Sequence, residues 1–231
     1  MVKLLLLSDI HGHLYPLREV VKVTRTLDIE VAVVAGDLTH FSGLEDAVSV
    51  LKLISSSIET VLFVPGNCDH PDLLETRDLG EKGVYNIHGR VFEVQGYRFY
   101  GIGGSNITPF GTFIEWSEEE LAKYLEPLWD IDKEKLVMVT HAPIHGVMDE
   151  IGGIHVGSRV LREFIDKHGA LLWITGHLHE YSGYKRIGYT VVVNPGPLAR
   201  GFYGIAVLED GEVEVEIYNI YESSKHSLHS L

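Results

Sequence analysis

The sequence predicts an α/β fold whose core is a parallel β-sheet. Short apolar runs rich in β-branched residues recur along the chain, each bounded by polar, Gly or Pro residues, which is typical of buried strands. Between the first three runs, residues 15–27 and 44–55 carry apolar positions at three- and four-residue spacing, which predicts helices. Strands and helices that alternate in this way form parallel sheets. The apolar runs are residues 3–7, 30–35, 60–64, 136–139, 171–174 and 189–193.

The region after residue 84 has a different pattern. Three segments, residues 84–87, 90–94 and 98–102, are separated by Gly89 and by Gln95-Gly96. Short strands joined by such turns predict an antiparallel meander. We therefore expect a mixed sheet.

The next segments alternate between a loop, two helices and a hairpin. Residues 104–116 contain Pro, Gly and three large aromatic side chains without periodicity, so we expect a loop or lid. Residues 117–120, Ser-Glu-Glu-Glu, give a capping-box start to a helix, and a further helix is expected over residues 157–168. Residues 202–208 and 212–220 flank Glu-Asp-Gly, a strong hairpin signal.

Length and composition indicate one globular domain. The chain has 231 residues, of which 45% are apolar and 23% are charged, and this is within the range of one large domain. No internal repeat or composition break divides it, so we expect a single domain over residues 1–221 and a flexible C-terminal tail over residues 222–231. The apolar stretch at residues 4–7 is too short for a signal peptide or a membrane span.

Charge and cysteine content narrow the partners and the compartment. The net charge of −14 makes nucleic acid and anionic membranes unfavourable partners. The single cysteine, Cys68, excludes an intramolecular disulfide and a Cys-rich metal site. We therefore expect a soluble, cytoplasmic protein that acts on a small molecule, and a homo-oligomer is compatible with the sequence.

Side chains able to bind metals follow the predicted strands. The carboxyl ends of strands in open α/β sheets form the crevice in which ligands bind, so these side chains are expected in one region. Carboxylate, amide and imidazole ligands without thiolates suit Mn²⁺, Fe or Zn²⁺ better than a structural zinc site or a Ca²⁺ site. The residues are Asp9 and His11 after the first strand, Asp37 after the second, Asn67 after the third, His141 after residues 136–139, and His177 and His179 after residues 171–174.

These residues form an ordered set of motifs that resembles the calcineurin-like metallophosphoesterases. The motifs are Asp9-x-His11, Gly36-Asp37, Gly66-Asn67-Cys68-Asp69, His141 and Gly176-His177-x-His179. The resemblance extends from the first strand to about residue 195, and Gly-Asn-Cys-Asp is similar to a small-phosphodiesterase branch of the family.

The resemblance implies a four-layer α/β/β/α sandwich with two mixed β-sheets and a dinuclear metal site at the carboxyl ends of the strands. It implies two divalent ions, with Mn²⁺ favoured and Fe, Zn²⁺ or Ni²⁺ as alternatives. By resemblance, Asp9, His11 and His179 hold the first metal, Asn67, His141 and His177 hold the second, and Asp37 bridges both.

The chain departs from the family at Cys68. The usual motif reads Gly-Asn-His-Asp or Gly-Asn-His-Glu, and its histidine protonates the leaving group or stabilises the transition state. A neutral thiol is a poorer proton donor, so we expect weaker acid catalysis. Cys68, Asp69 and His70 are candidate catalytic residues beside the ligands, and His13 or His40 are alternatives to His70 as the proton donor.

Four side chains are candidates for substrate contacts. Phe110 and Phe113 could stack on an aromatic part of the ester, although we favour the interpretation that they close their loop against the core. Arg200 could bind phosphate through its guanidinium or lie on the surface. His145, four residues after His141, could reach the substrate or lie behind the site.

The resulting hypothesis is a metal-dependent phosphoesterase, most readily a phosphodiesterase acting on a small phosphodiester or nucleotide. The resemblance implies that a metal-bridging hydroxide attacks phosphorus while the metals and His141 organise the oxyanion. Two alternatives remain: a catalytically weak protein-binding scaffold on the same fold, and a phosphomonoesterase.

Overall fold

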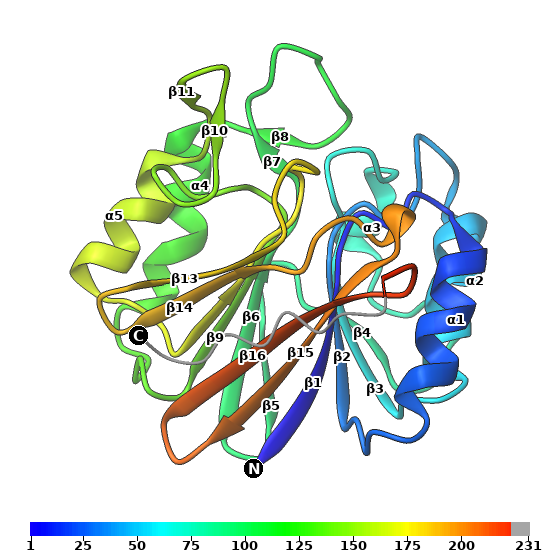
Figure 1. Cartoon of the computed structure of the whole chain (residues 1–231). Helices are drawn as coiled ribbons and strands as arrows, with labels where there is room; N and C mark the ends of the chain where they lie inside the picture. The colour runs from blue at the N-terminus through cyan, green and yellow to red at the C-terminus, as the bar shows by residue number, and fades with distance from the viewer. Residues whose placement is uncertain (223–231) are drawn as a thin grey trace.

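Two six-stranded sheets lie face to face at the centre of the computed structural model, which describes residues 1–222 (Figure 1). In the first sheet the strand order is β16-β15-β1-β2-β3-β4, and β1 to β4 are parallel while β15 and β16 are antiparallel to their neighbours. Its strands are β1 (Val2–Leu7), β2 (Val31–Ala35), β3 (Thr60–Val64), β4 (Val84–Asn86), β15 (Phe202–Glu209) and β16 (Glu212–Asn219).

The second sheet has the order β13-β14-β12-β9-β6-β5. Its four inner strands are parallel, and each edge strand is antiparallel to its neighbour. The edge strand β13 was not predicted from the sequence. The strands are β5 (Val91–Val94), β6 (Tyr97–Ile102), β9 (Leu136–Thr140), β12 (Leu172–Ile174), β13 (Gly183–Ile187) and β14 (Thr190–Asn194).

Helices cover the outer face of each sheet, and the predicted α/β/β/α sandwich with two mixed sheets is confirmed. The first sheet packs against α1 (Leu14–Thr24), α2 (Leu44–Ser55) and α3 (Asp72–Glu75). The second packs against α4 (Glu118–Leu125), η1 (Glu126–Leu128) and α5 (Arg159–Lys167). Within residues 1–222, none of the helices combines the length and apolar character needed to cross a bilayer.

Short elements complete the fold. A turn of 3-10 helix, η2 (Leu198–Arg200), follows β14, and two small two-stranded pairs extend from the second sheet. They are β7 (Ser105–Asn106) with β8 (Glu115–Trp116), and β10 (Glu150–Ile151) with β11 (Ile154–His155).

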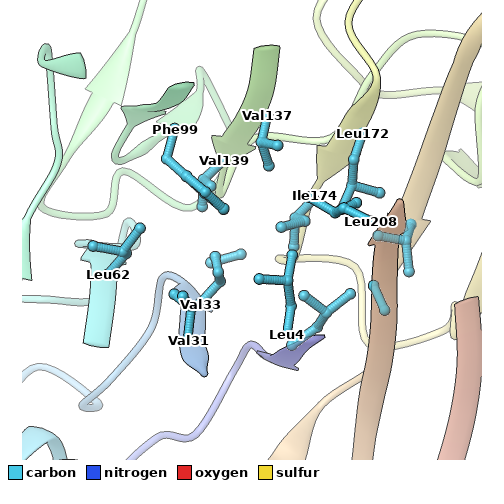
Figure 2. Close-up of a cluster of buried hydrophobic side chains, with 14 of the residues drawn as sticks. Leu4, Val31, Val33, Leu62, Phe99, Val137, Val139, Leu172, Ile174 and Leu208 are labelled. Atoms are coloured by element: carbon cyan, nitrogen blue, oxygen red, sulfur yellow. The ribbon is translucent and has the colours of Figure 1, made fainter. Parts of the chain in front are cut away.

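Strand β1 shows why the predicted strands are continuous apolar runs. Successive side chains of a strand point to opposite faces of the sheet. Leu4, labelled in Figure 2, packs in the core between the two sheets, as does Leu6. Leu5 and Leu7 pack in the core under α1 and α2. Because both faces of the sheet are covered, positions 4–7 of the strand are all apolar, whereas Lys3 near its start is only half-buried.

The predicted antiparallel meander over residues 84–102 is only half right. Strands β5 and β6 do form a hairpin in the second sheet, but β4 lies in the first sheet, parallel to β3. The chain crosses from one sheet to the other between residues 87 and 90. Short apolar strands have the same local pattern in either sheet, so sequence could not distinguish a crossing from a turn.

The other predicted turns and caps are confirmed. At both hairpins the two turn residues have positive φ: 47° and 82° at Gln95-Gly96, and 48° and 83° at Asp210-Gly211, as type I′ turns require. Ser117 and Glu120 form the capping box of α4. The helix expected over 157–168 is α5, capped by Ser158. Of the predicted tail, residues 223–231 lie outside the described part of the chain.

A buried histidine holds the crossing between the sheets. His88 is 4% exposed; its Nδ1 accepts a hydrogen bond from the Gly103 N–H at 2.9 Å, and its Nε2 lies 3.1 Å from the Tyr124 hydroxyl. The accepting Nδ1 requires the neutral ring with its proton on Nε2. Burial, together with Arg77 and Arg90, lowers the pKa of His88 to about 4.

We expect His88 to make the fold less stable in acid. An unfolded His has a pKa near 6.5, so between pH 6.5 and about 4 the unfolded chain binds a proton that the folded chain does not. The free energy of unfolding should fall as the pH drops through this window, by at most about 1.4 kcal/mol per pH unit from this group. Urea unfolding at several pH values measures it. His88→Gln keeps a donor and an acceptor but does not titrate, so parallel pH profiles for wild type and variant would contradict the prediction.

Candidate metal centre

The loops after five strands meet at one end of the two sheets. The loops after β1, β2 and β3 come from the first sheet, and those after β9 and β12 come from the second. The side chains expected to bind metals converge there within hydrogen-bonding or ion-pair distance of one another. Four of them have left-handed backbone conformation, which is uncommon outside Gly and occurs at functional sites: Asp9 (φ 52°), His11 (48°), Asp37 (51°) and His177 (70°).

Asp37 lies at the centre of the cluster. Its Oδ2 is 3.6 Å from His11 Nε2 and 3.4 Å from His141 Nε2. Its Oδ1 accepts a hydrogen bond of 2.9 Å from the Cys68 N–H. Burial opposes the charged carboxylate, but His141 outweighs it and holds the pKa of Asp37 well below its usual range. One carboxylate oxygen therefore faces ligand nitrogens on two sides.

On one side of Asp37 lie Asp9, His11 and His179. His179 Nε2 is 3.1 Å from Asp9 Oδ1 and 3.2 Å from His11 Nε2. The Asp9 carboxylate also accepts hydrogen bonds from the His177 N–H, which orient it. These three side chains can place donor atoms within 4.8 Å of one another, which is compatible with a shared cation.

On the other side lie Asn67, His141 and His177. Asn67 Oδ1 is 2.9 Å from His141 Nε2 and 2.8 Å from His177 Nδ1. His141 Nδ1 is 2.8 Å from the carbonyl oxygen of Ala35, so that nitrogen donates and Nε2 is the atom that could bind a metal. Asp37, Asp9 and His141 form a further group with metal-binding distances.

The protonation equilibria of the cluster fit a cation site. Burial lowers the pKa of His11, and burial with the nearby His141 lowers that of His177 to about 4, so both rings are neutral and able to bind a metal. Burial also works against charge on His141, yet Asp37 raises its pKa to about 9. The buried carboxylates of Asp9 and Asp37 thus stabilise positive charge nearby. Divalent metals held by neutral imidazoles would supply that charge.

Glycines let the loops approach closely. Gly36, with φ 86°, packs against the His141 ring, and Gly66 packs against the Asp37 carboxylate. A Cβ at either position would overlap these side chains. The glycine in each motif is therefore a condition for bringing the ligands together.

A cavity of about 750 Å³ opens over the cluster. Its wall includes the predicted ligands His11, Asp37, Asn67, His177 and His179. Cys68, Phe110 and Arg200 also line it, as do His13, His40, Phe41, Thr112 and Ala199.

Comparison with known proteins identifies the family and the fold. The profile described as calcineurin-like phosphoesterase matches residues 2–181. The chain belongs to this family. An uncharacterized protein of Methanocaldococcus jannaschii, MJ1162, is 34% identical over 220 residues, which cover 90% of this chain and 96% of that protein.

Solved structures share the fold of this phosphoesterase. TT1561 of Thermus thermophilus superposes with a TM-score of 0.75 at 21% identity, covering 94% of this chain and 98% of that one. A dimetal phosphatase from Danio rerio has a TM-score of 0.65 at 15% identity, covering 94% and 95%. An archaeal phosphodiesterase has a TM-score of 0.56 at 15% identity, covering 94% and 100%.

Asp69, a candidate catalytic residue, lies behind the cavity wall. It is fully buried, and its carboxylate accepts hydrogen bonds from the N–H groups of Leu38, Thr39 and Gly66 and from the Thr39 hydroxyl, at 2.8–3.0 Å. These bonds tie the loop that carries Asp37 to the loop that carries Asn67. In this position Asp69 supports the ligand loops and has no access to substrate.

Cys68 lines the cavity but stays a neutral thiol. Burial, followed by the charge of Asp37, raises the pKa of its thiol far above neutrality. A protonated thiol of this kind is neither a strong nucleophile nor an efficient acid. The expectation of weak acid catalysis at this position therefore has a structural cause.

Some of the candidate proton donors and substrate residues line the cavity, and others do not. His70 lies beside Asp72, whose N–H is 3.3 Å from its Nδ1, and it does not line the cavity. His145 is also outside the lining and packs edge-on against His155. His13, His40 and Arg200 line the cavity, and Arg200 donates a hydrogen bond to the His179 carbonyl at 3.2 Å.

Phe110 contradicts the expectation that both phenylalanines pack their loop onto the core. Phe110 is 81% exposed and lines the cavity. Phe113 is 50% exposed and makes an edge contact with Phe41, 5.0 Å between ring centroids. The core packing is done instead by Ile114, which is buried.

Thr112 is a site residue that the sequence analysis missed. Its hydroxyl accepts a hydrogen bond of 2.9 Å from the Asn67 amide and donates to Glu115 at 2.5 Å. Because the Asn67 NH₂ is held by Thr112, its oxygen faces His141 and His177. Burial opposes the charge on Glu115, but bonds from Thr108 and Thr112 lower its pKa to about 2, so it stays an acceptor. A lone Thr in a loop has no pattern that would have revealed this role.

We predict that Thr112→Val weakens metal binding by about 10–100-fold, the usual effect of losing a group that orients a metal ligand. Isothermal titration of the chelator-treated protein with Mn²⁺ measures it. Thr108→Val is the matched control, since Thr108 bonds Glu115 in the same loop but has no bond to Asn67. Equal Mn²⁺ affinity in Thr112→Val and wild type would show that Thr112 does not orient the ligand.

Proposed function

We propose that this protein is a phosphodiesterase that hydrolyses a small phosphodiester or nucleotide with the help of two divalent metal ions, Mn²⁺ being the first candidate. The observation that carries the proposal is the position of Asp37. One of its oxygens, Oδ2, lies between His11 and His141 and thus between the two sets of candidate ligands. A carboxylate in that position suits a bridge between two cations.

Each of the two sets of side chains would hold one metal ion. Asp9, His11 and His179 would hold one ion and Asn67, His141 and His177 the other, with Asp37 shared. When bound, such a pair supplies a water of lowered pKa and neutralises charge on phosphoryl oxygens. Asn67 adds an oxygen ligand without adding negative charge, which favours an anionic substrate.

The charge of the cavity wall supports a diester over a monoester. Among the described residues that line the cavity, Arg200 is the one Lys or Arg side chain. A phosphodiester carries one negative charge, whereas a monoester carries close to two at neutral pH and needs more cationic partners. We assign to Arg200, which lines the cavity, the binding of one non-reacting phosphoryl oxygen through its guanidinium.

The leaving group of the reaction needs a proton that Cys68 is poorly suited to supply. Of the three histidines considered as donors, His40 is both exposed to the cavity and close to the ligands, with its ring centroid 5.3 Å from that of His11. We therefore assign the proton donor to His40 in preference to His70.

We expect chelator-stripped protein to hydrolyse bis-p-nitrophenyl phosphate only after Mn²⁺ is added, and faster than it hydrolyses p-nitrophenyl phosphate. Release of p-nitrophenolate measures both reactions. Asp37→Asn, which keeps the shape of the buried side chain, should abolish turnover, whereas Asp72→Asn, an exposed position outside the cavity, should not. Metal binding without turnover of either ester would instead favour a protein-binding scaffold, and faster monoester turnover would favour a phosphomonoesterase.

We also predict that His40→Ala slows diesters with poor leaving groups more than it slows bis-p-nitrophenyl phosphate. The p-nitrophenolate anion leaves without a proton, whereas an alkoxide requires one. Comparing kcat for an alkyl diester and for the chromogenic diester measures the difference. His70→Ala is the control and should leave both rates unchanged; an equal loss on both substrates in His40→Ala would rule out the proton-donor role.

A further inference from the structure

Exposed aromatic rings line the cavity over the candidate metal centre. Phe110 is 81% exposed and Phe41 is 45% exposed, and both line the cavity. Phe113, at 50% exposure, contacts Phe41 but is not part of the lining. Large apolar rings left in water next to a site are typical of a ligand-binding surface.

Phe41 is held in a conformation that a bulky residue rarely adopts. Its φ is 54°, and its N–H donates a 2.9 Å hydrogen bond to the carbonyl of Cys68. Its ring is flanked by His40 on one side, at 4.8 Å, and Phe113 on another, at 5.0 Å between centroids. Positive φ in a bulky residue is unfavourable and persists where surrounding structure enforces it, often at ligand sites. The fold therefore enforces the placement of this partly exposed ring.

The loop that carries Phe110 is anchored on both sides of that residue. Glu115 accepts hydrogen bonds from the backbone N–H groups of Thr108 and Thr112, at 3.1 and 2.8 Å, and Phe110 N–H donates to the Thr108 hydroxyl at 3.2 Å. Thr112 is in turn bonded to Asn67 of the metal centre. Hydrogen bonds thus hold the backbone that carries the exposed Phe110 ring and connect its loop to the metal centre.

The cavity is larger than a phosphate needs. A volume of about 750 Å³ is within the range for binding a drug-sized molecule. His11, Asp37, Asn67 and His177 occupy its polar part, where the phosphoryl group would lie. The rest of the wall includes two phenyl rings, Phe41 and Phe110, beside polar side chains such as His13 and His40. The phenyl rings suit a flat unsaturated ring better than a branched group.

We propose that Phe41 and Phe110 form a stacking subsite for a flat ring, such as a nucleobase, on the ester bound at the metal centre. This inference rests on the proposed phosphodiesterase function and names its substrate class: phosphoesters of alcohols that carry a flat unsaturated ring. Stacking on aromatic side chains depends little on the identity of the base. The subsite would therefore favour esters that carry a flat ring over esters that lack one, without distinguishing between bases.

The test compares two ligands that differ by the base alone. The methyl phosphodiesters of adenosine 5′-monophosphate and of ribose 5-phosphate, each with one negative charge, are titrated by calorimetry into the Mn²⁺-loaded protein. We expect wild type to bind the nucleotide about tenfold or more tightly than the sugar phosphate, the range that base stacking supplies. Phe110→Ala should bring the ratio close to one, and Phe41→Leu, which keeps apolar bulk but removes the flat ring, should reduce it.

Ile107→Ala is the matched control, because Ile107 lies in the same loop and is 67% exposed but does not line the cavity. It should keep the wild-type ratio. Equal binding of the two ligands by wild type, binding of neither, or an unchanged ratio in Phe110→Ala would each overturn the subsite.

Hydrolysis of bis-p-nitrophenyl phosphate, measured on the same protein samples, reports the proposed function separately. Base-selective binding without hydrolysis would retain the subsite and reject the phosphodiesterase. Hydrolysis without base-selective binding would do the reverse.

Discussion

The placement of one buried carboxylate, Asp37, constrains the rest of this structure. It must face His11 from its own sheet and His141 from the other sheet at the same time, so the two sheets have to end at the same level. Gly36 and Gly66 allow the close approach, and the Cys68 N–H holds the second oxygen. The stacked sheets are therefore part of the site as well as its support.

Burying charges and bending the backbone both cost free energy, and the layered core offsets that cost. Leu4, Val33, Val139 and Ile174 pack between the two sheets, on the strands from which the site-bearing loops leave (Figure 2). Their burial stabilises the strands from which the loops leave. The strained positions, such as Asp9 and His177, are thus enforced by strands that have many other contacts. Asp69 stabilises the same region through hydrogen bonds that join the loop carrying Asp37 to the loop carrying Asn67.

The cavity is lined by polar, charged and apolar side chains, which suit different parts of the proposed substrate. Five of the candidate metal ligands line the cavity, together with the positively charged Arg200 and the apolar rings of Phe41 and Phe110. Cys68 contributes a neutral thiol where the family's usual motif has a histidine. An enzyme of this design would depend on its metals and on substrate binding more than on acid catalysis at that position.

Local patterns in the sequence were enough to predict the α/β layers and the hairpin turns, because apolar periodicity and turn chemistry are properties of neighbouring residues. Motif order likewise singled out the candidate metal-binding side chains, which the fold brings to one end of the two sheets. The strand alternation also implied that the ligands after β1, β2 and β3 share one edge. Contacts between segments far apart in the chain decided the rest. The sheet to which β4 belongs, the position of Asp69 behind the cavity, the bond from Thr112 to Asn67 and the separation of His70 from His40 all depend on how loops from two sheets meet. No local pattern encodes these features, since each arises from packing between residues tens of positions apart.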